Sequence, residues 1–170
     1  IPDLAPGTDM FLPERVNSHG TDLRNLPMLA EVDAVRAPFR DHIWTAAPMI
    51  AGSTSPLPAQ PVTDPATGAT VGHVSPASPA DIETAMADAA PWSQDARTRA
   101  ATLSRAADLY EAHLGEIFAV LAREAGKTQL DAEAELREAV DFLRYYAARA
   151  EDETQPAGLF TCISPWNFPL

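Results

Sequence analysis

Apolar side chains recur at helical spacing from residue 78 to residue 150. Ser78, Pro79 and Asp81 are typical of the N-cap, first and third positions of a helix, so we expect a helix to begin there. Farther along, one apolar stripe crosses two helices that meet near Gly115, and a last helix has an apolar core face and a mixed face. The stripe of the two joined helices is Leu103, Ala106, Ala107, Tyr110, Leu114, Ile117, Phe118 and Leu121; the core face of the last helix is Leu136, Ala139, Val140, Leu143, Tyr146 and Ala147; and its mixed face is Asp131, Glu135, Glu138, Phe142 and Tyr145.

Residues 1–60 follow a different pattern, because prolines interrupt them throughout. Proline fixes its own φ and biases the preceding residue towards extended backbone, so most of this part is expected to be loop. One short helix is predicted between Pro27 and Pro38, where apolar residues return at helical spacing. Residues 51–59 have the composition of a linker. We therefore expect a proline-rich inter-domain arm over residues 1–60.

Residues 61–75 are expected to form a β-hairpin. The strand-like runs 62–63 and 70–74 flank a turn in which Pro65 presets one position and Gly68 can adopt a positive φ. Two strands alone are marginally stable, so the hairpin should pack on another element.

A short apolar run at 159–163 follows Gly158 and contains β-branched residues. It predicts a buried strand that enters a loop at Ser164-Pro165. Together with the hairpin and the helices, this strand places the chain in the α/β class. The expected organisation is the arm followed by one domain portion over residues 61–170, which holds the hairpin, the helices at 78–150, and the strand and loop at 159–170.

Composition narrows the classes of function. Lys and Arg total 12 against 24 Asp and Glu, a net charge of -12, which argues against binding of nucleic acid or anionic membranes by this segment. Hydrophobic residues at 46% and charged residues at 21% are values of a globular chain. A single cysteine, Cys162, excludes an internal disulfide framework and fits a reducing, cytoplasmic compartment. No apolar run reaches the roughly 20 residues of a membrane span, and the N-terminus lacks a secretory pattern.

Three features suggest chemistry but have simpler interpretations. Cys162 has no cationic neighbour in sequence to lower its pKa, so a small buried hydrophobe is favoured over a nucleophile. Gly126-Lys127-Thr128 lacks the upstream glycine of a phosphate loop, since Leu121 stands there; a helix that ends at Gly126, with Lys127 near its negative end, is favoured. The four histidines are dispersed without ligand spacing, which predicts no metal site.

Two further features keep alternatives open. Glu138 and Phe142 stand four residues apart on the mixed face, a spacing that places the carboxylate beside the aromatic ring. The pair could belong to a site, or the face could be solvated with a half-buried Phe. In the run 164–169, two prolines bracket Trp, Asn and Phe directly after the predicted strand. Ligands of α/β sheets bind beyond the carboxyl ends of strands. An oxyanion donor must be held rigidly in place, and a loop stiffened by two prolines would hold the Asn167 amide in this way. A rigid turn with aromatic anchors explains the same composition.

The run Ile163–Pro169 strongly resembles the hallmark loop of the aldehyde dehydrogenase family. Arg123–Thr128 is similar to the Glu-x-Gly-Lys segment of that family, and the turn at Asp64–Gly68 to its opening hairpin. Glu138–Ala147 resembles the branch that oxidises L-glutamate γ-semialdehyde, the open form of pyrroline-5-carboxylate. Arg15–Leu23 is similar to the segment between the two catalytic domains of the bifunctional proline utilization A enzymes. The resemblance covers nearly the whole chain.

This resemblance implies the N-terminal portion of an aldehyde dehydrogenase fold and a set of roles. Residues 61–170 would be the N-terminal part of the NAD-binding domain, and the strand at 159–163 would be the first strand of its Rossmann-like sheet. Asn167 would donate its amide to the oxyanion of a thiohemiacetal, and Phe168 would form one wall of an aromatic slot around the substrate. Glu138 would lie near the aldehyde, with Phe142 behind it, whereas Cys162 would remain a strand residue. The nicotinamide-ribose side of NAD would be lined by four loop residues: Ile163, Ser164, Pro165 and Trp166.

The resemblance also implies a larger parent enzyme. The chain opens on Ile1 and ends at Leu170 after a strand-like run, as expected of a segment of something longer. The nucleophilic cysteine and the general base would lie beyond Leu170, so the segment alone would be inactive. Expected partners are the remainder of the domain, a second copy in a homo-oligomer, and a proline dehydrogenase domain, which alone would bring FAD. Between Ala150 and Leu159 the connector is shorter than is usual in the family.

Two other hypotheses remain. One is a stand-alone semialdehyde dehydrogenase without a proline dehydrogenase domain. The other is a non-catalytic helical interaction module, which the amphipathic helices and the missing nucleophile would support.

Overall fold

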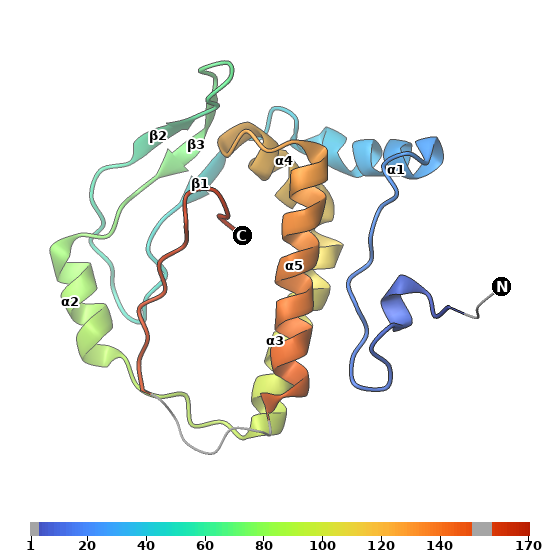
Figure 1. The fold of residues 1–170 in the computed structure, drawn as a ribbon. Helices are drawn as coiled ribbons and strands as arrows, with labels where there is room; N and C mark the ends of the chain where they lie inside the picture. Colours follow the sequence, from blue (N-terminus) through green and yellow to red (C-terminus); the bar gives the residue numbers. More distant parts are fainter. Residues whose placement is uncertain (1–3, 151–157) are drawn as a thin grey trace.

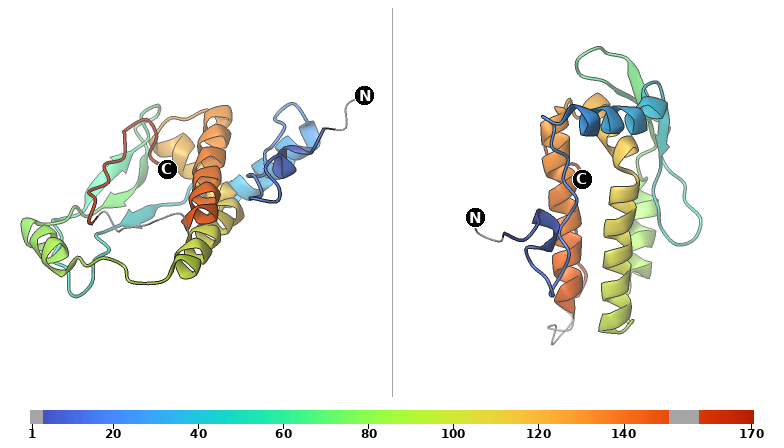
Figure 2. Two further views of the ribbon diagram at one scale, coloured as in Figure 1. Left: turned by 60° about the horizontal axis from the view of Figure 1, so that its bottom comes forward. Right: turned by 90° about the vertical axis from the view of Figure 1, so that its right-hand side faces the viewer.

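Five α-helices and a three-stranded sheet make up the part of the chain that the computed structural model describes, residues 4–150 and 158–170. Figure 1 shows α3, α4 and α5 together on one side, the sheet and α2 on the other, and the C-terminal residues between them. In Figure 2, the left view places the N-terminal arm on the side of α5 away from the sheet. In chain order the elements are η1 (Gly7–Asp9), α1 (Leu26–Arg36), η2 (Ala37–Phe39), β1 (Trp44–Ala46), β2 (Gln60–Thr63), β3 (Thr70–Val74), α2 (Pro79–Asp88), α3 (Ala96–Ala112), α4 (Leu114–Glu124) and α5 (Gln129–Ala148).

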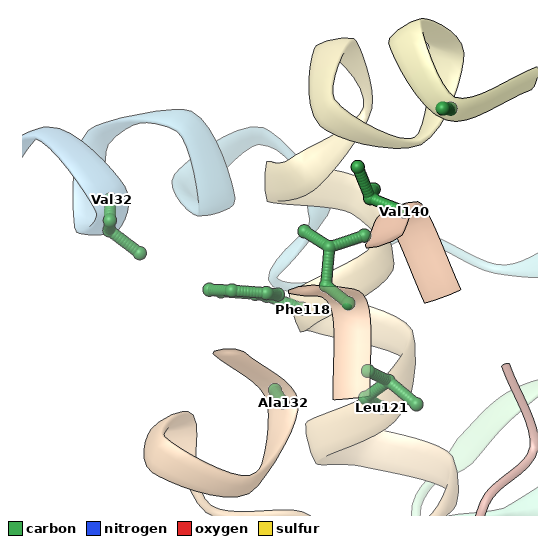
Figure 3. Packing of buried hydrophobic residues seen from close by; sticks show 7 residues of the cluster. Val32, Phe118, Leu121, Ala132 and Val140 are labelled. Atoms are coloured by element: carbon green, nitrogen blue, oxygen red, sulfur yellow. The ribbon is translucent and has the colours of Figure 1, made fainter. Parts of the chain in front are cut away.

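The hydrophobic core lies where α1, α3, α4 and α5 meet (Figure 3). Phe118 of α4 and Val140 of α5 are 1% and 0% exposed, and Ala107 of α3 is equally buried. These residues belong to the predicted apolar stripes, so helical periodicity identified the core correctly. Tyr146, expected on the core face of α5, is instead 59% exposed and packs against its aromatic neighbours Phe142 and Tyr145.

The crossing of α1 and α4 depends on Gly115. A Cβ at this position would lie 2.2 Å from the Val35 carbonyl oxygen of α1, which is closer than real atoms approach. The sequence marked Gly115 as a joint between helices, and the structure places it at the start of α4, directly after α3 ends at Ala112. The glycine therefore lies in the first turn of α4 and allows two helix backbones to come together.

The sheet contains the predicted hairpin and one strand that was not predicted. β2 and β3 pair antiparallel across a turn in which Gly68 has φ 74°. β1 lies on the other edge of β3 and runs parallel to it, with Trp44 opposite Gly72. Residues 44–46 were expected to be loop; a three-residue strand among prolines has no periodic signal, and its pairing partner is distant in sequence. Arg123 of α4 joins the sheet to the helices by donating to the main-chain carbonyls of Phe39 and His42, just before β1, and of Thr70 in β3.

The observed ends of α2 and α4 agree with the capping and glycine signals in the sequence. The Ser78 hydroxyl and the Asp81 carboxylate form a capping box at α2, and Asp81 also accepts the Ser55 amide at 2.7 Å. These amides, from Ser55 and then Ser78, lower the pKa of Asp81. At the other end of the helical region, α4 ends at Glu124 and Gly126 adopts φ 65°, as its position after the helix predicts. No helix in the described part of the chain is long and apolar enough to cross a membrane.

The strand predicted at 159–163 is not formed. These residues have no regular structure, and Phe160 and Ile163 are 75% and 87% exposed. A strand needs a neighbour to satisfy its backbone, and the sheet of the described residues, β1-β3-β2, does not extend to this segment. Cys162, expected to be a buried strand residue, is consequently exposed. The short connector after Ala150 lies mostly outside the described residues.

Candidate functional site

The loop that carries Asn167 is a turn held against the junction of α4 and α5. The chain turns at Trp166-Asn167, and the Phe168 amide donates to the Pro165 carbonyl at 3.3 Å. Beyond the turn, Leu170 packs against the hydrophobic core. The two prolines and this apolar end give the loop a defined path, although most of its side chains remain exposed.

Lys127 and Glu135 contact the loop from the helix side. The Lys127 ammonium lies 3.1 Å from Glu135 Oε2, donates to the Asn167 main-chain carbonyl and stands 4.5 Å from the centre of the Phe168 ring. The other Glu135 oxygen, Oε1, accepts the Leu170 amide at 2.9 Å. Glu135 is only 4% exposed and the Lys127 side chain 15%, so the charges meet largely away from solvent.

A cleft of about 560 Å³ opens beside this loop, between β1 and α4. Its polar edge includes Glu116, whose Oε1 accepts a hydrogen bond from the Trp44 indole at 3.0 Å. The other oxygen of Glu116, Oε2, lies 3.4 Å from His113 Nδ1. Most of the remaining lining is apolar: Ile117, Val120, Leu121, Trp166, Pro169 and Leu170.

The structure brings some of the predicted site residues together and leaves others apart. Six of them share the loop: Ile163, Ser164, Pro165, Trp166, Asn167 and Phe168. Glu138 and Phe142 lie on α5 and are exposed, and Phe142 stacks on Tyr146 at 6.3 Å between ring centres. Among the described residues, no hydrogen bond or ring contact joins Glu138 or Phe142 to the loop; the loop meets α5 at Glu135, one turn earlier.

Sequence reasoning missed Lys127 and Glu135. Lys127 was interpreted as a cation at a helix end, and Glu135 as one carboxylate on a mixed face. Their pairing spans the α4–α5 link, so no helical i, i+3 or i, i+4 spacing could reveal it. A usable signal was the rarity of lysine, since Lys127 is the single lysine in an acidic chain.

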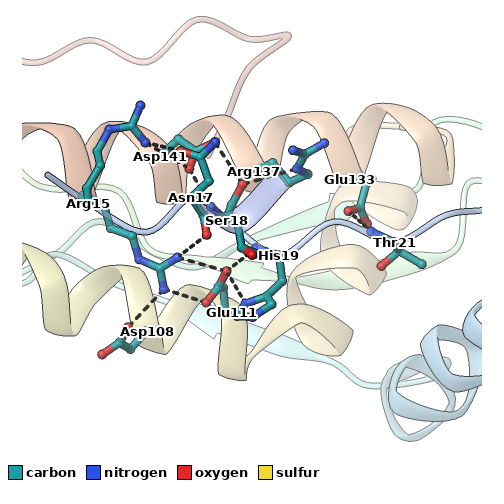
Figure 4. A network of polar contacts seen from close by, with 12 residues as sticks. Arg15, Asn17, Ser18, His19, Thr21, Asp108, Glu111, Glu133, Arg137 and Asp141 are labelled. Atoms are coloured by element: carbon teal, nitrogen blue, oxygen red, sulfur yellow. Dashed lines mark hydrogen bonds and ion pairs between the residues drawn. The ribbon is translucent and has the colours of Figure 1, made fainter. Parts of the chain in front are cut away.

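A second polar network holds the strap, which we define as residues 15–21, against α3 and α5 (Figure 4). Asp141 accepts both the amide and the hydroxyl of Ser18, at 2.7 and 3.0 Å. The Thr21 amide donates to Glu133 at 2.7 Å. Three carboxylates thus replace the backbone partners that a strand would have: Asp141, Glu133 and Glu111.

Glu111 is the most connected of these carboxylates. It accepts the His19 amide at 2.8 Å and a hydrogen bond from Arg144 at 2.7 Å. Burial alone would raise the pKa of Glu111, but the Arg144 and His19 hydrogen bonds and the Arg144 charge together lower it below its ordinary value of 4.5. Burial also opposes the charge of Arg144, yet Glu111 and Asp108 raise its pKa. This network ties the arm to the helices and has no contact with the Asn167 loop among the described residues.

The described residues contain no group of three His, Cys, Asp or Glu side chains that could hold a metal ion.

Comparison with known proteins identifies the class. Residues 52–170 match the aldehyde dehydrogenase family, and the chain belongs to that family. The bifunctional protein PutA of Klebsiella aerogenes is 40% identical over 180 residues, which cover 99% of this chain and 14% of the relative. Relatives of this kind are much longer: the chain spans 14% of the length of the curated relatives that it matches first.

Solved structures agree with the fold. A variant of Bradyrhizobium japonicum proline utilization A has a TM-score of 0.67 and 31% identity, over 96% of this chain and 16% of that one. A 1-pyrroline-5-carboxylate dehydrogenase from Thermus with bound NAD has a TM-score of 0.68 over 90% of this chain and 35% of that one; at 23% identity this likeness concerns the fold alone. The helices and small sheet are thus a mixed α/β arrangement that matches the N-terminal part of the aldehyde dehydrogenase fold.

Proposed function

We propose that this chain is the N-terminal part of the dehydrogenase domain of an enzyme that oxidises L-glutamate γ-semialdehyde to L-glutamate in proline catabolism. The observation that carries the proposal is the 40% identity to a bifunctional PutA protein over 99% of the chain. Three bifunctional PutA proteins match over 99% of the chain, including the residues before position 52 where the family match begins, and this supports a bifunctional parent. A proline dehydrogenase domain, with FAD, would then belong to the same protein.

The loop would stabilise the charge that develops during the reaction. A thiolate from outside this chain would attack the aldehyde carbon, and negative charge would develop on the aldehyde oxygen. The Asn167 side-chain amide would donate to that oxygen. Phe168 would pack along the aliphatic stem of the substrate. Glu138 would lie near the aldehyde end with Phe142 behind it, and the exposure of both side chains leaves them accessible to a ligand.

The same loop would line one side of a dinucleotide site. Ile163 and Trp166 are 87% and 90% exposed, so apolar surface is open for a nicotinamide ring. Ser164 and Pro165 would complete this side, partly through backbone groups. When bound, NAD supplies the hydride acceptor. The remainder of the domain, and a second copy in a homo-oligomer, would complete the enzyme in a cytoplasmic compartment.

The direct test is oxidation of L-glutamate γ-semialdehyde by the full-length protein that contains this chain. We expect NADH formation at 340 nm, and a higher kcat/KM for this substrate than for succinate semialdehyde. Equal or better oxidation of succinate semialdehyde would contradict the proposed substrate. No NADH with either aldehyde would contradict the proposed activity itself.

A second test addresses Asn167. In the full-length enzyme, Asn167→Ala should lower kcat by roughly 10²–10³, the usual cost of losing an oxyanion donor. Steady-state kinetics with Gln60→Ala, which removes an exposed amide on β2, supply the control. An unchanged kcat in Asn167→Ala would exclude the assigned role.

A further inference from the structure

We propose that Lys127 and Glu135 are positioning residues for the Asn167 loop, an inference that rests on the proposed function of Asn167. Two hydrogen bonds define the arrangement. The Lys127 ammonium donates to the main-chain carbonyl of Asn167, and Glu135 Oε1 accepts the main-chain amide of Leu170 at 2.9 Å. Because Lys127 and Glu135 are themselves 3.1 Å apart, one ion pair holds the loop at two places.

The burial of this pair indicates that its contacts with the loop matter. A carboxylate as buried as Glu135, at 4% exposure, is costly unless a partner compensates its charge. Its Oε2 atom accepts no hydrogen bond from the described residues, so the Lys127 charge is the group that compensates it. Lys127 reaches this position because Gly126, at φ 65°, turns the chain between α4 and α5. The pair does not lie within one helix, and a contribution to helix stability therefore does not explain it.

The contact with Asn167 has a chemical consequence. The Asn167 carbonyl and its side-chain amide belong to one residue, so fixing the carbonyl restricts where the amide can point. The ring of Phe168, under the same ammonium at 4.5 Å, limits the loop further. An oxyanion donor acts best when it is held in place before the reaction, and a displacement of about 1 Å can cost about 10²-fold in rate. Lys127 would thus act on catalysis through Asn167, without touching the substrate.

The experiment combines amide exchange and kinetics in the full-length protein. Lys127→Met should raise hydrogen exchange at the Phe168 and Leu170 amides by about tenfold, the factor that corresponds to one net hydrogen bond. It should also lower kcat by about 10- to 100-fold, with KM for NAD nearly unchanged, because orientation and not cofactor binding is lost. Lys127→Arg, which keeps the charge, should restore most of kcat.

Two more variants separate the anchors. Glu135→Gln can still accept the Leu170 amide but no longer pairs with the ammonium, so exchange should rise at Phe168 more than at Leu170. Glu83→Gln makes the same chemical change at an exposed position of α2 and is the matched control, with exchange and kcat expected to stay at the wild-type values.

The outcomes distinguish this inference from the proposed function. Unchanged exchange in both Lys127→Met and Glu135→Gln would overturn the positioning role, whatever the activity. Faster exchange with an unchanged kcat would also overturn it. If the wild-type protein does not oxidise glutamate semialdehyde, the proposed function fails and amide exchange alone decides the role of the pair. If Lys127→Met does not fold, Lys127→Arg and Glu135→Gln decide: equal exchange and equal kcat in these two variants would overturn the inference.

Discussion

Two irregular segments lie against α5, and they are held in different ways. The strap gives main-chain amides to carboxylates spaced along α3 and α5, at Ser18, His19 and Thr21. The C-terminal segment, residues 158–170, is exposed over most of its length and is held near its end by Lys127 and Glu135. Among the described residues, the polar segment is therefore fixed at more points than the apolar one.

The difference shows that apolar composition alone does not order a segment. The strap contains mostly polar residues, yet the amides of Ser18, His19 and Thr21 each find a carboxylate partner. The run at 159–163 is strongly apolar, but within the described structure it has neither a neighbouring strand nor a core to cover it. A segment takes a fixed path when its backbone groups have hydrogen-bond partners, and carboxylates on α3 and α5 supply these partners to the strap.

The largest loss of stability is expected from a substitution in the hydrophobic core, against which both segments lie. Phe118→Ala deletes a ring that is 1% exposed and should lower the free energy of unfolding by about 3–5 kcal/mol. Urea unfolding of the chain, followed by circular dichroism, measures the change. Met86→Ala, at an exposed position of α2, is the control. A loss below about 1 kcal/mol would mean that α4 is not central to the core.

The next effect concerns the strap alone. Asp141→Ala leaves the Ser18 amide and hydroxyl without their acceptor and should cost about 1–3 kcal/mol. Trypsin should then cut faster after Arg15, which measures release of the strap directly. Glu138→Ala, one turn away on α5 and exposed, should change stability by less than about 0.5 kcal/mol. Equal effects of the two variants would show that the strap is not held by Asp141.

Acid should weaken the strap through Glu111. Its pKa is lower in the folded chain than the ordinary 4.5, so its contribution to stability is present above that pH and is lost as the pH falls through the lower folded value. Glu111→Gln should therefore cost about 1 kcal/mol at pH 7, a value reduced by partial exposure, and progressively less towards pH 3. Urea unfolding of both proteins across this range tests the sign. A difference that grows on acidification would contradict it.

The smallest effect is expected in the C-terminal segment. Phe160 is 75% exposed, so Phe160→Ala should change the free energy of unfolding of the chain by less than about 0.5 kcal/mol. The same substitution at Phe118 should cost several times more, which makes the pair a direct comparison of two phenylalanines. A large loss at Phe160 would show that residues 159–163 are buried as a strand after all.

The sequence predicted those parts of the fold whose signals are local. The Ser78 capping box, the Gly126 helix end, the Gly68 turn and the apolar stripe through Phe118 all depend on residues within a few positions of each other. β1 was missed because its pairing with β3 joins residues far apart in the chain. The strand at 159–163 was wrong because a strand depends on a neighbour that periodicity cannot supply.

The candidate site divides in the same way. The loop around Asn167 could be found from its composition and its family resemblance, because its residues are consecutive. Glu138 and Phe142 were placed near it only by resemblance, and their roles stay a prediction. The ion pair of Lys127 and Glu135 could not be found, because it forms only when the turn after α4 brings the two side chains together.

The solitary lysine also gives the molecule a built-in reporter. A protease specific for lysine has a single cleavage site in this chain, after Lys127, in the link between α4 and α5. An amine-reactive label likewise has one side-chain target, whose amine is mostly covered by the ion pair and the loop. Slow cutting and slow labelling would report a closed loop and fast reaction an open one, without any engineered probe.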